Sequence, residues 1–199
     1  MRIYIVRHGH STWNEEGRLQ GVKDTDLHHK GFDQAHILGK RLESSSISKI
    51  YCSPLKRAFH TGEIINKYLN VPIIKDQSLI EMNFGILEGN TKDQSKTLHS
   101  EFFTYWEKHR FSTVIPNGES YEMLFNRSFQ ALETIVKKNN EDILLISHGS
   151  FIRALICKIM DIDLDKSYKL SFDNCGISVL EHINNRFIIK TINDIGHFF

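Results

Sequence analysis

The sequence of 199 residues is poor in the features that mark extracellular, membrane and nucleic-acid-binding proteins. It holds three Cys, and 25 Lys and Arg residues nearly balance 24 Asp and Glu residues. An odd number of widely spaced Cys is typical of proteins in the reducing cytosol, where thiols stay unpaired. Proteins that bind nucleic acid or an anionic membrane usually have more basic than acidic residues. There is no apolar run near the ~18 residues of a membrane span, and we expect no signal peptide. We therefore expect a cytoplasmic protein with no nucleic-acid or membrane partner.

Nothing in the sequence marks a domain boundary. Only three Pro and twelve Gly are present, and there is no repeat, proline-rich linker or long charge run. A chain of this size can bury about 70% of its unfolded surface without a disulfide or a metal. We expect residues 1–199 to form a single domain, and the composition leaves open whether it is a monomer or a homodimer.

Strand-like and helix-like patterns alternate along the chain. Short apolar runs at residues 3–6 and 143–146 are typical of parallel strands buried on both faces. Shorter strands are expected at 50–52 and 72–74, and two more around a turn at 184–185. Apolar positions at helical spacing predict helices over 32–42, 54–69, 124–135 and 152–159, the second with Ser53 as N-cap and Pro54 at its first position. This alternation predicts a three-layer α/β/α sandwich with a mostly parallel central sheet.

Arginine and histidine follow three of the predicted strands. Residues 3–6 run into Arg7-His8-Gly9, residues 50–52 into Ser53 and Arg57, and residues 143–146 into Ser147-His148-Gly149. Ligands of such sheets bind beyond the carboxyl ends of the strands, so these side chains should converge. Guanidinium groups match phosphate oxygens, and an imidazole nitrogen can attack phosphorus to form a covalent intermediate. The pattern therefore predicts a pocket for a phosphoryl group.

The same segments carry a resemblance to a known family. Arg7-His8-Gly9, Ser53-Pro54-Leu55-Lys56-Arg57-Ala58 and Ser147-His148-Gly149 occur in order with Ser11-Thr12-Trp13-Asn14, Gln20-Gly21, Glu81, Phe84-Gly85, Glu88-Gly89 and Pro116-Asn117-Gly118-Glu119-Ser120. Together they resemble the histidine phosphatase superfamily, also called phosphoglycerate mutase-like, and are most similar to its small broad-specificity phosphatase branch. The resemblance extends across nearly the whole chain.

The resemblance implies a metal-independent phosphomonoesterase of the histidine acid phosphatase type, with no cofactor and a small phosphorylated metabolite as substrate. His8 is then the nucleophile that becomes phosphohistidine, and Glu81 is the general acid and base. Sequence alone leaves Glu81 and Glu88 equivalent, and the family pattern selects Glu81. The implied phosphoryl-binding residues are Arg7, Arg57 and His148, and the implied substrate-binding residues are Asn14, Gly21, Ser11 and Gly149.

One residue departs from the family pattern. His10 stands where the family usually has a glutamate. Its imidazole could lie behind the site, tune substrate charge or bind an adventitious metal. A metal site at His8 and His10 is disfavoured because no Cys or carboxylate cluster completes the spacing. A serine hydrolase triad around Ser147 and His148 is disfavoured because there is no Gly-x-Ser-x-Gly elbow.

Residues 86–118 are expected to form a helical insertion over the active site. Phe102, Phe103, Tyr105 and Trp106 could line the substrate pocket or simply pack between helices. Glycolytic mutases of the family use paired arginines in this region to hold a bisphosphate, and the stretch 89–117 holds only Arg110. The sequence therefore favours a phosphatase. The alternatives are a cofactor-dependent phosphoglycerate mutase, which is an isomerase, and a non-catalytic phospholigand-binding module. The physiological substrate and any residual mutase activity stay open.

Overall fold

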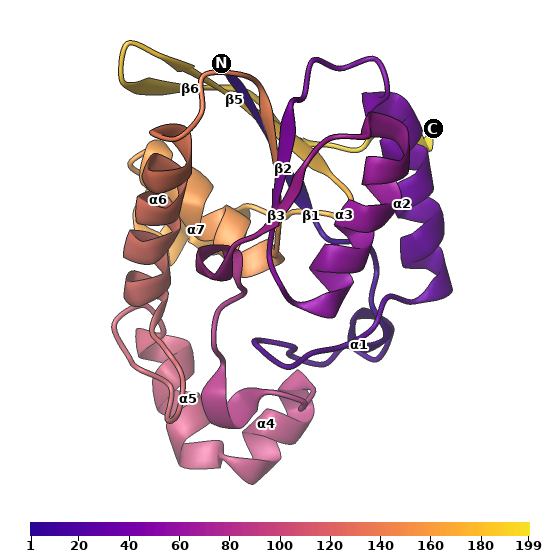
Figure 1. Ribbon diagram of the computed structural model, residues 1–199. Coiled ribbons are helices and arrows are strands. Elements are labelled where there is room, and N and C mark those ends of the chain that lie inside the picture. The colour runs from indigo at the N-terminus through magenta and orange to yellow at the C-terminus, as the bar shows by residue number, and fades with distance from the viewer.

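A mixed six-stranded sheet forms the centre of the molecule (Figure 1). The computed structural model describes the backbone of residues 1–199 and all side chains except those at positions 164 and 165. The strand order is β3-β2-β4-β1-β5-β6. The strands are β1 (Arg2–Arg7), β2 (Lys49–Cys52), β3 (Ile73–Lys75), β4 (Ile143–Ser147), β5 (Ile177–Ile183) and β6 (Arg186–Asp194).

The four strands from β3 to β1 run parallel, whereas β5 pairs antiparallel with both β1 and β6. The predicted mostly parallel sheet is therefore confirmed, with an antiparallel hairpin at one edge. All five residues of β4 are buried, as expected for a central parallel strand between two helical layers. The hairpin turns at Asn184 and Asn185, which both have positive φ, a conformation that asparagine tolerates.

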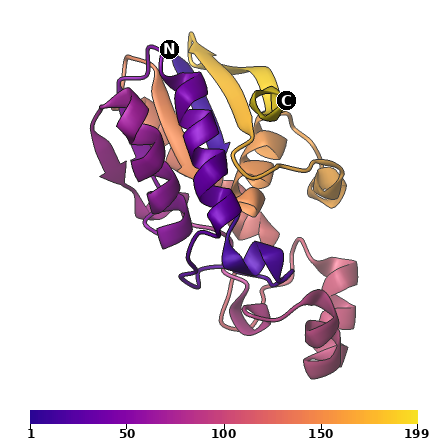
Figure 2. The same cartoon turned by 90° about the vertical axis from the view of Figure 1, so that its right-hand side faces the viewer.

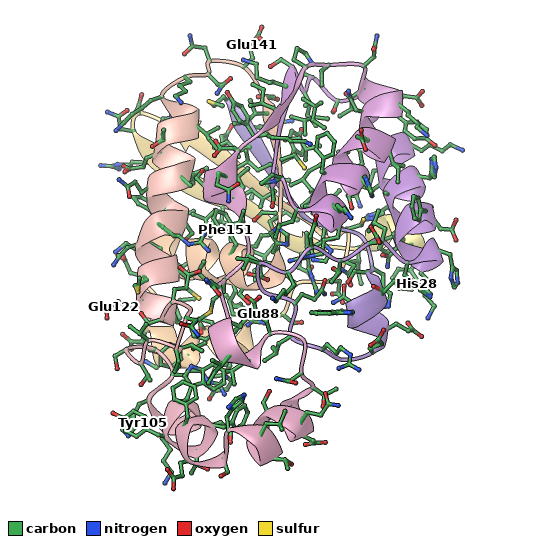
Figure 3. The ribbon with its side chains drawn as sticks, turned by 60° about the horizontal axis from the view of Figure 1, so that its bottom comes forward. His28, Glu88, Tyr105, Glu122, Glu141 and Phe151 are labelled. Atoms are coloured by element: carbon green, nitrogen blue, oxygen red, sulfur yellow. The ribbon has the colours of Figure 1, made fainter. Side chains whose placement is uncertain are left out.

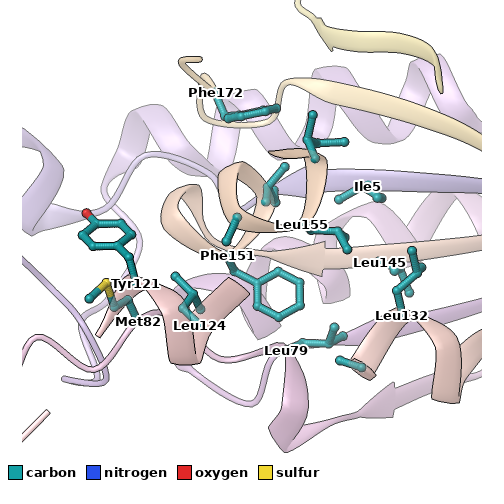
Figure 4. Packing of buried hydrophobic residues seen from close by; sticks show 14 of the residues in the cluster. Ile5, Leu79, Met82, Tyr121, Leu124, Leu132, Leu145, Phe151, Leu155 and Phe172 are labelled. Atoms are coloured by element: carbon teal, nitrogen blue, oxygen red, sulfur yellow. The ribbon is translucent and has the colours of Figure 1, made fainter. Parts of the chain in front are cut away.

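Helices cover both faces of the sheet, which confirms the three-layer sandwich (Figure 1). On one face α2 (His29–Leu42) and α3 (Lys56–Leu69) pack on a core cluster that includes Leu38, Ile65 and Ile146. On the other face α6 (Tyr121–Val136) and α7 (Gly149–Ile159) pack on a larger cluster around Phe151 and Leu145 (Figure 4). Every helix of the described chain falls short of the length and apolarity needed to cross a lipid bilayer.

The start of α3 differs from the prediction. The helix begins at Lys56 with Leu55 as N-cap, so Ser53 does not cap it and Pro54 is not its first residue. The Asp24 carboxylate from a distant loop accepts the Lys56 N–H at 2.7 Å and supplies the missing cap. The Ser53 hydroxyl instead lies 2.7 Å from the Nε2 of His148. The Ser53-Pro54 pair correctly indicated a turn before the helix. The hydrogen bond between Asp24 and Lys56, which joins distant segments, determines that the helix starts at Lys56.

The segment 86–118 contains two helices, α4 (Lys92–Leu98) and α5 (Ser100–His109). They project beyond the carboxyl ends of the parallel strands, as Figure 2 shows. Phe103 and Trp106 are buried in the larger core cluster, whereas Tyr105 is exposed. Packing between helices therefore accounts for Phe103 and Trp106. The remaining short elements are α1 (Thr12–Glu15), η1 (Gln77–Leu79), η2 (Gly85–Leu87), η3 (Leu164–Lys169) and η4 (Gly196–Phe198).

Candidate active site

Three neighbouring parallel strands end at one cleft. In the sheet register Arg7 pairs with Ser147 and Cys52 pairs with Ile146, so the segments that follow β1, β2 and β4 emerge together. The cleft has a volume of about 210 Å³. It is lined by Arg7, His8, Asn14, Arg18, Leu19, Gln20, Gly21, Arg57, Glu81, Phe84, Gly149, Ser150, Arg153, Ser171 and Phe172. The predicted convergence is confirmed for Arg7, His8, Arg57 and Gly149, whereas His148 is not among the lining residues.

His8 is held in the tautomer that a nucleophile needs. Its side chain is 2% exposed, and its Nδ1 lies 2.7 Å from the carbonyl oxygen of Gly9. A carbonyl only accepts hydrogen bonds, so Nδ1 carries the proton and Nε2 keeps a lone pair. Burial and the positive charges of Arg57 and Arg7 hold the pKa of His8 well below its usual range. His8 is therefore a neutral imidazole at physiological pH.

Arg57 is buried and Arg7 is partly buried, and neither has a carboxylate partner among the described side chains. Arg7 Nη1 donates to the Phe172 carbonyl at 2.5 Å, and Arg57 donates from Nη1 and Nη2 to the carbonyls of Lys23 and Gly21. The Nε of each arginine is buried with no hydrogen-bond partner in the described chain. Burial lowers the pKa of Arg57 to about 10 and also lowers the pKa of Arg7. Two guanidinium groups that are shielded from water and have no carboxylate partner favour the binding of an anion.

His148 lies beside His8 as the N-cap of α7. The two ring centroids are 5.1 Å apart, and the His148 ring is fully buried. Its Nε2 is 2.7 Å from the Ser53 hydroxyl, while its Nδ1 has no partner among the described atoms. Burial and the charge of Arg57 hold the pKa of His148 well below its usual range. A Ser53 hydroxyl that donates to Nε2 leaves Nδ1 as a proton donor.

Glu81 lies against the first turn of α7. Its Oε2 accepts the Ser150 N–H at 3.1 Å, and its Oε1 accepts the N–H groups of Phe151 and Met82 at 3.2 and 2.8 Å. The amides at a helix N-terminus are orphan donors that suit a carboxylate. Glu81 thus reaches the cleft from the loop after η1, on the same helix end as His148.

Glu88 has a different position, although the residues alone did not separate it from Glu81. It is half-buried, and its Oε1 accepts the N–H groups of Val22 and Phe84 at 2.9 and 3.0 Å (Figure 3). It ties the loop around Gly21 to the loop around Phe84. Gly21 has a φ of +54°, and a Cβ there would lie 1.9 Å from the Glu88 Oε1, so this position needs glycine.

Two further charged residues support the loop that carries Glu81. Arg127 in α6 donates to the Glu81 and Ile80 carbonyls at 2.8 and 3.1 Å. It also forms a bidentate ion pair with Glu119, at 2.9 Å from Nε and 2.7 Å from Nη2. Glu119 in turn accepts the Asn83 N–H at 2.9 Å. This clamp of Arg127 and Glu119 fixes the backbone on both sides of Glu81.

The four expected substrate-binding residues divide into two groups. Asn14, Gly21 and Gly149 line the cleft. Ser11 is not among the lining residues: it is the N-cap of α1, and its hydroxyl donates to Gln20 at 2.8 Å. Ser11 therefore orders the loop that presents Asn14 and does not face the cleft itself.

Sequence reasoning missed two arginines of the cleft. Arg153 follows Gly149 by four residues in α7, so helical spacing could have placed both on one face. Arg18 resembles a surface charge in the sequence, yet it reaches the cleft and donates to the Gly89 carbonyl at 2.7 Å. Ser171 and Phe172 also line the cleft. They lie in a segment outside the helices and strands, so no periodic pattern in the sequence could have predicted their position.

The chain matches the family described as "Histidine phosphatase superfamily (branch 1)" over residues 3–195. This protein belongs to the histidine phosphatase superfamily. It is 31% identical over 198 residues, 99% of this chain and 94% of the relative, to phosphoserine phosphatase 1 of Hydrogenobacter thermophilus. It is 29% identical over 203 residues, again 99% and 94% of the two chains, to a probable phosphoglycerate mutase of Erwinia tasmaniensis.

The fold is also that of a solved member of similar length. YhfR of Bacillus stearothermophilus superposes with a TM-score of 0.92 at 30% identity, covering 100% of this chain and 99% of the other. The phosphoglycerate mutase-like architecture is thereby confirmed. Membership of the histidine phosphatase superfamily makes the chain an enzyme of the phosphatase class.

Proposed function

We propose that this histidine phosphatase hydrolyses phosphate monoesters of small metabolites through a phosphohistidine at His8. One observation carries the proposal: the neutral His8 imidazole lies beside buried donors that have no hydrogen-bond partner among the described residues. These donors are the Nε atoms of Arg7 and Arg57 and the Nδ1 of His148. A phosphoryl group supplies several anionic oxygens, which matches such a set of donors.

The reaction proceeds in two displacements at phosphorus. In the first, the lone pair on His8 Nε2 forms a bond to phosphorus as the ester P–O bond breaks, and Glu81 gives its proton to the leaving oxygen. In the second, Glu81 takes a proton from water, which attacks phosphorus while the N–P bond breaks. Inorganic phosphate and free His8 result. Arg7, Arg57 and His148 bind the phosphoryl oxygens in both steps and stabilise the charge of the transition state.

The positions of the residues support this assignment of roles. Glu81 and His148 share the N-terminal end of α7, so the proton donor and one phosphate donor are fixed relative to each other. His8 donates its main-chain N–H to the Ser147 carbonyl at 2.9 Å, which fixes the nucleophile to the same strand end. No step requires a metal ion, and metal independence is part of the proposal.

A mutase is the second candidate, because the matched relatives include a probable phosphoglycerate mutase. Family mutases hold the bisphosphate with paired arginines in this segment, and in 89–117 the only arginine is Arg110. Its guanidinium lies 4.8 Å from the centre of the Trp106 ring. This supports water as the phosphoryl acceptor.

We propose that the segment 86–118 covers the cleft, since α4 and α5 lie at the same end of the sheet (Figure 1).

The test is hydrolysis of a panel of phosphorylated metabolites and of p-nitrophenyl phosphate, in excess EDTA, by wild-type protein and the His8→Ala variant. We expect the wild type to release phosphate in EDTA and the variant to release none. Loss of wild-type turnover in EDTA would contradict the metal-free mechanism. Isomerisation of 3-phosphoglycerate that 2,3-bisphosphoglycerate strongly stimulates would instead establish the mutase. Binding of a phosphorylated ligand without turnover would establish a binding module.

A further inference from the structure

A second group of histidines lies on the outer side of the loop that carries His8. His10, Glu15 and His28, here called the His10 cluster, each offer a ligand atom within 4.8 Å of the others. The His10 Nε2 is 2.9 Å from the Glu15 Oε2, and the ring centroids of His10 and His28 are 5.7 Å apart. The residues that line the phosphate cleft do not include any of the three. We propose that the His10 cluster is a binding site for a borderline divalent metal ion such as Zn²⁺.

The backbone brings the two histidines together before any metal binds. The segments before α1 and α2 pair as a short antiparallel ladder, with a bridge between Ser11 and Leu27. The His28 N–H donates to the His10 carbonyl at 2.9 Å, and the Thr12 N–H donates to the Asp26 carbonyl at 3.2 Å. His10 and His28 are thus opposite residues of this ladder, and side chains of opposite residues share one face.

The third ligand comes from α1. Its capping box, formed by Ser11 and Asn14, starts the helix directly after His10 and turns Glu15 back toward that residue. Two imidazoles and one carboxylate are a donor set that suits zinc and leave a fourth position for water. Nδ1 of His28 is buried and has no hydrogen-bond partner among the described residues, so one ring nitrogen of this histidine is not engaged by the protein. In Figure 3, His28 lies at the right-hand edge of the molecule.

A protein cation already competes for the carboxylate of the cluster. Lys30 Nζ lies 3.0 Å from Oε2 and 3.3 Å from Oε1 of Glu15. Zinc must displace this ammonium group and the hydrogen bond between His10 and Glu15. For Nε2 of His10 to bind the metal, this nitrogen must offer its lone pair and the ring proton must lie on Nδ1. Removal of Lys30 should therefore strengthen metal binding.

The test is isothermal titration calorimetry of the protein with Zn²⁺ alone, without substrate. We expect one ion per chain for the wild type, and Kd values raised by more than about tenfold in His10→Gln and His28→Gln, since loss even of outer-shell partners costs about 10–100-fold. Glu15→Gln should weaken binding and Lys30→Gln should strengthen it. His36→Gln is the matched control, because His36 is an exposed histidine of α2 outside the cluster. This experiment is independent of the proposed function, since it measures no turnover.

The pattern across the variants decides the outcome. A zinc affinity that is unchanged in His10→Gln and His28→Gln, or that falls as much in His36→Gln, would overturn the proposal and show scattered surface binding. Absence of stoichiometric binding in wild type and Lys30→Gln alike would overturn it as well. Circular dichroism of each variant verifies the fold, so that a lost signal is assigned to the ligand and not to unfolding.

Discussion

His8 and His10 are separated by one residue, yet their surroundings are opposite. His8, Arg57 and His148 are buried beside the partly buried Arg7, and none of these four pairs with a carboxylate among the described side chains. His10 is partly exposed and lies against Glu15, whose other partner is Lys30. The cleft therefore concentrates donors for an anion, whereas the outer surface of the same loop presents acceptors for a cation. The difference comes from partners and burial, since both sites use histidine.

The largest expected effect comes from removing the proposed nucleophile, His8. We expect His8→Ala to lower kcat/KM for any substrate of the enzyme by about 10⁴-fold or more, because nucleophile loss in covalent enzymes costs effects of this size. Steady-state phosphate release measures it. The control is His36→Ala, an exposed histidine outside both sites, which should retain wild-type activity. An active His8→Ala variant would refute the assignment of the nucleophile.

Arg57→Lys tests the buried cations. The variant keeps the positive charge but loses the fork that donates to the carbonyls of Gly21 and Lys23. We expect kcat to fall by about 10²–10³-fold, the usual effect of losing one charge-stabilising donor. The same change at Arg41, which is on the surface and pairs with Asp194, is the control. If both variants had wild-type kcat, Arg57 would hold loops together without stabilising the transition state.

Arg127→Met tests the clamp behind Glu81. Because Arg127 fixes the Glu81 and Ile80 carbonyls and does not line the cleft, it is a positioning residue. Misplacement of a catalytic group by about 1 Å can cost up to about 10²-fold in rate, so we expect kcat to fall by about tenfold with little change in KM. Arg127→Lys should recover part of the loss. A change confined to thermal stability would leave Arg127 a purely structural residue.

The last expected effect concerns pH and stability. Because the pKa values of His8 and His148 are lowered in the folded state, the unfolded chain binds protons at these residues near pH 6.5 while the folded chain does not. The free energy of unfolding should therefore fall as the pH drops below about 6.5, by about 1.4 kcal/mol per pH unit for each histidine. Urea unfolding at pH 7, 6 and 5 measures the slope.

His8→Gln isolates the contribution of one residue. Its unfolding free energy should depend on pH less steeply than that of the wild type, by about one proton over this interval. An identical slope would mean that His8 titrates equally in both states. That result would remove the electrostatic difference between His8 and an ordinary surface histidine.

Much of the fold and of the site followed from the sequence because both depend on local patterns. Apolar runs marked β1 and β4, and the polar residues directly after them had to meet at one edge of a parallel sheet. Arg7, His8, Arg57 and Glu81 accordingly line one cleft. The family resemblance, and not the spacing, had separated Glu81 from Glu88, and of the two carboxylates only Glu81 is among the residues that line the cleft.

The features that the sequence did not reveal depend on contacts between distant segments. The cap of α3 comes from Asp24, the clamp behind Glu81 comes from Arg127, and Arg18 reaches the cleft from a loop. Such contacts leave no periodic signal. His10 was recognised as a departure, but its partner His28 lies 18 positions further along the chain, and only the backbone pairing of these two segments brings them together.

The most direct test of the account is to trap the covalent intermediate. The enzyme is mixed with a phosphate monoester in EDTA, quenched in base within one turnover, and digested for peptide mass mapping. We predict an acid-labile phosphate on the peptide that contains His8, formed at least as fast as steady-state phosphate release and absent from His8→Ala. Turnover in EDTA without phosphate on His8, or with phosphate on another residue, would contradict the central claim.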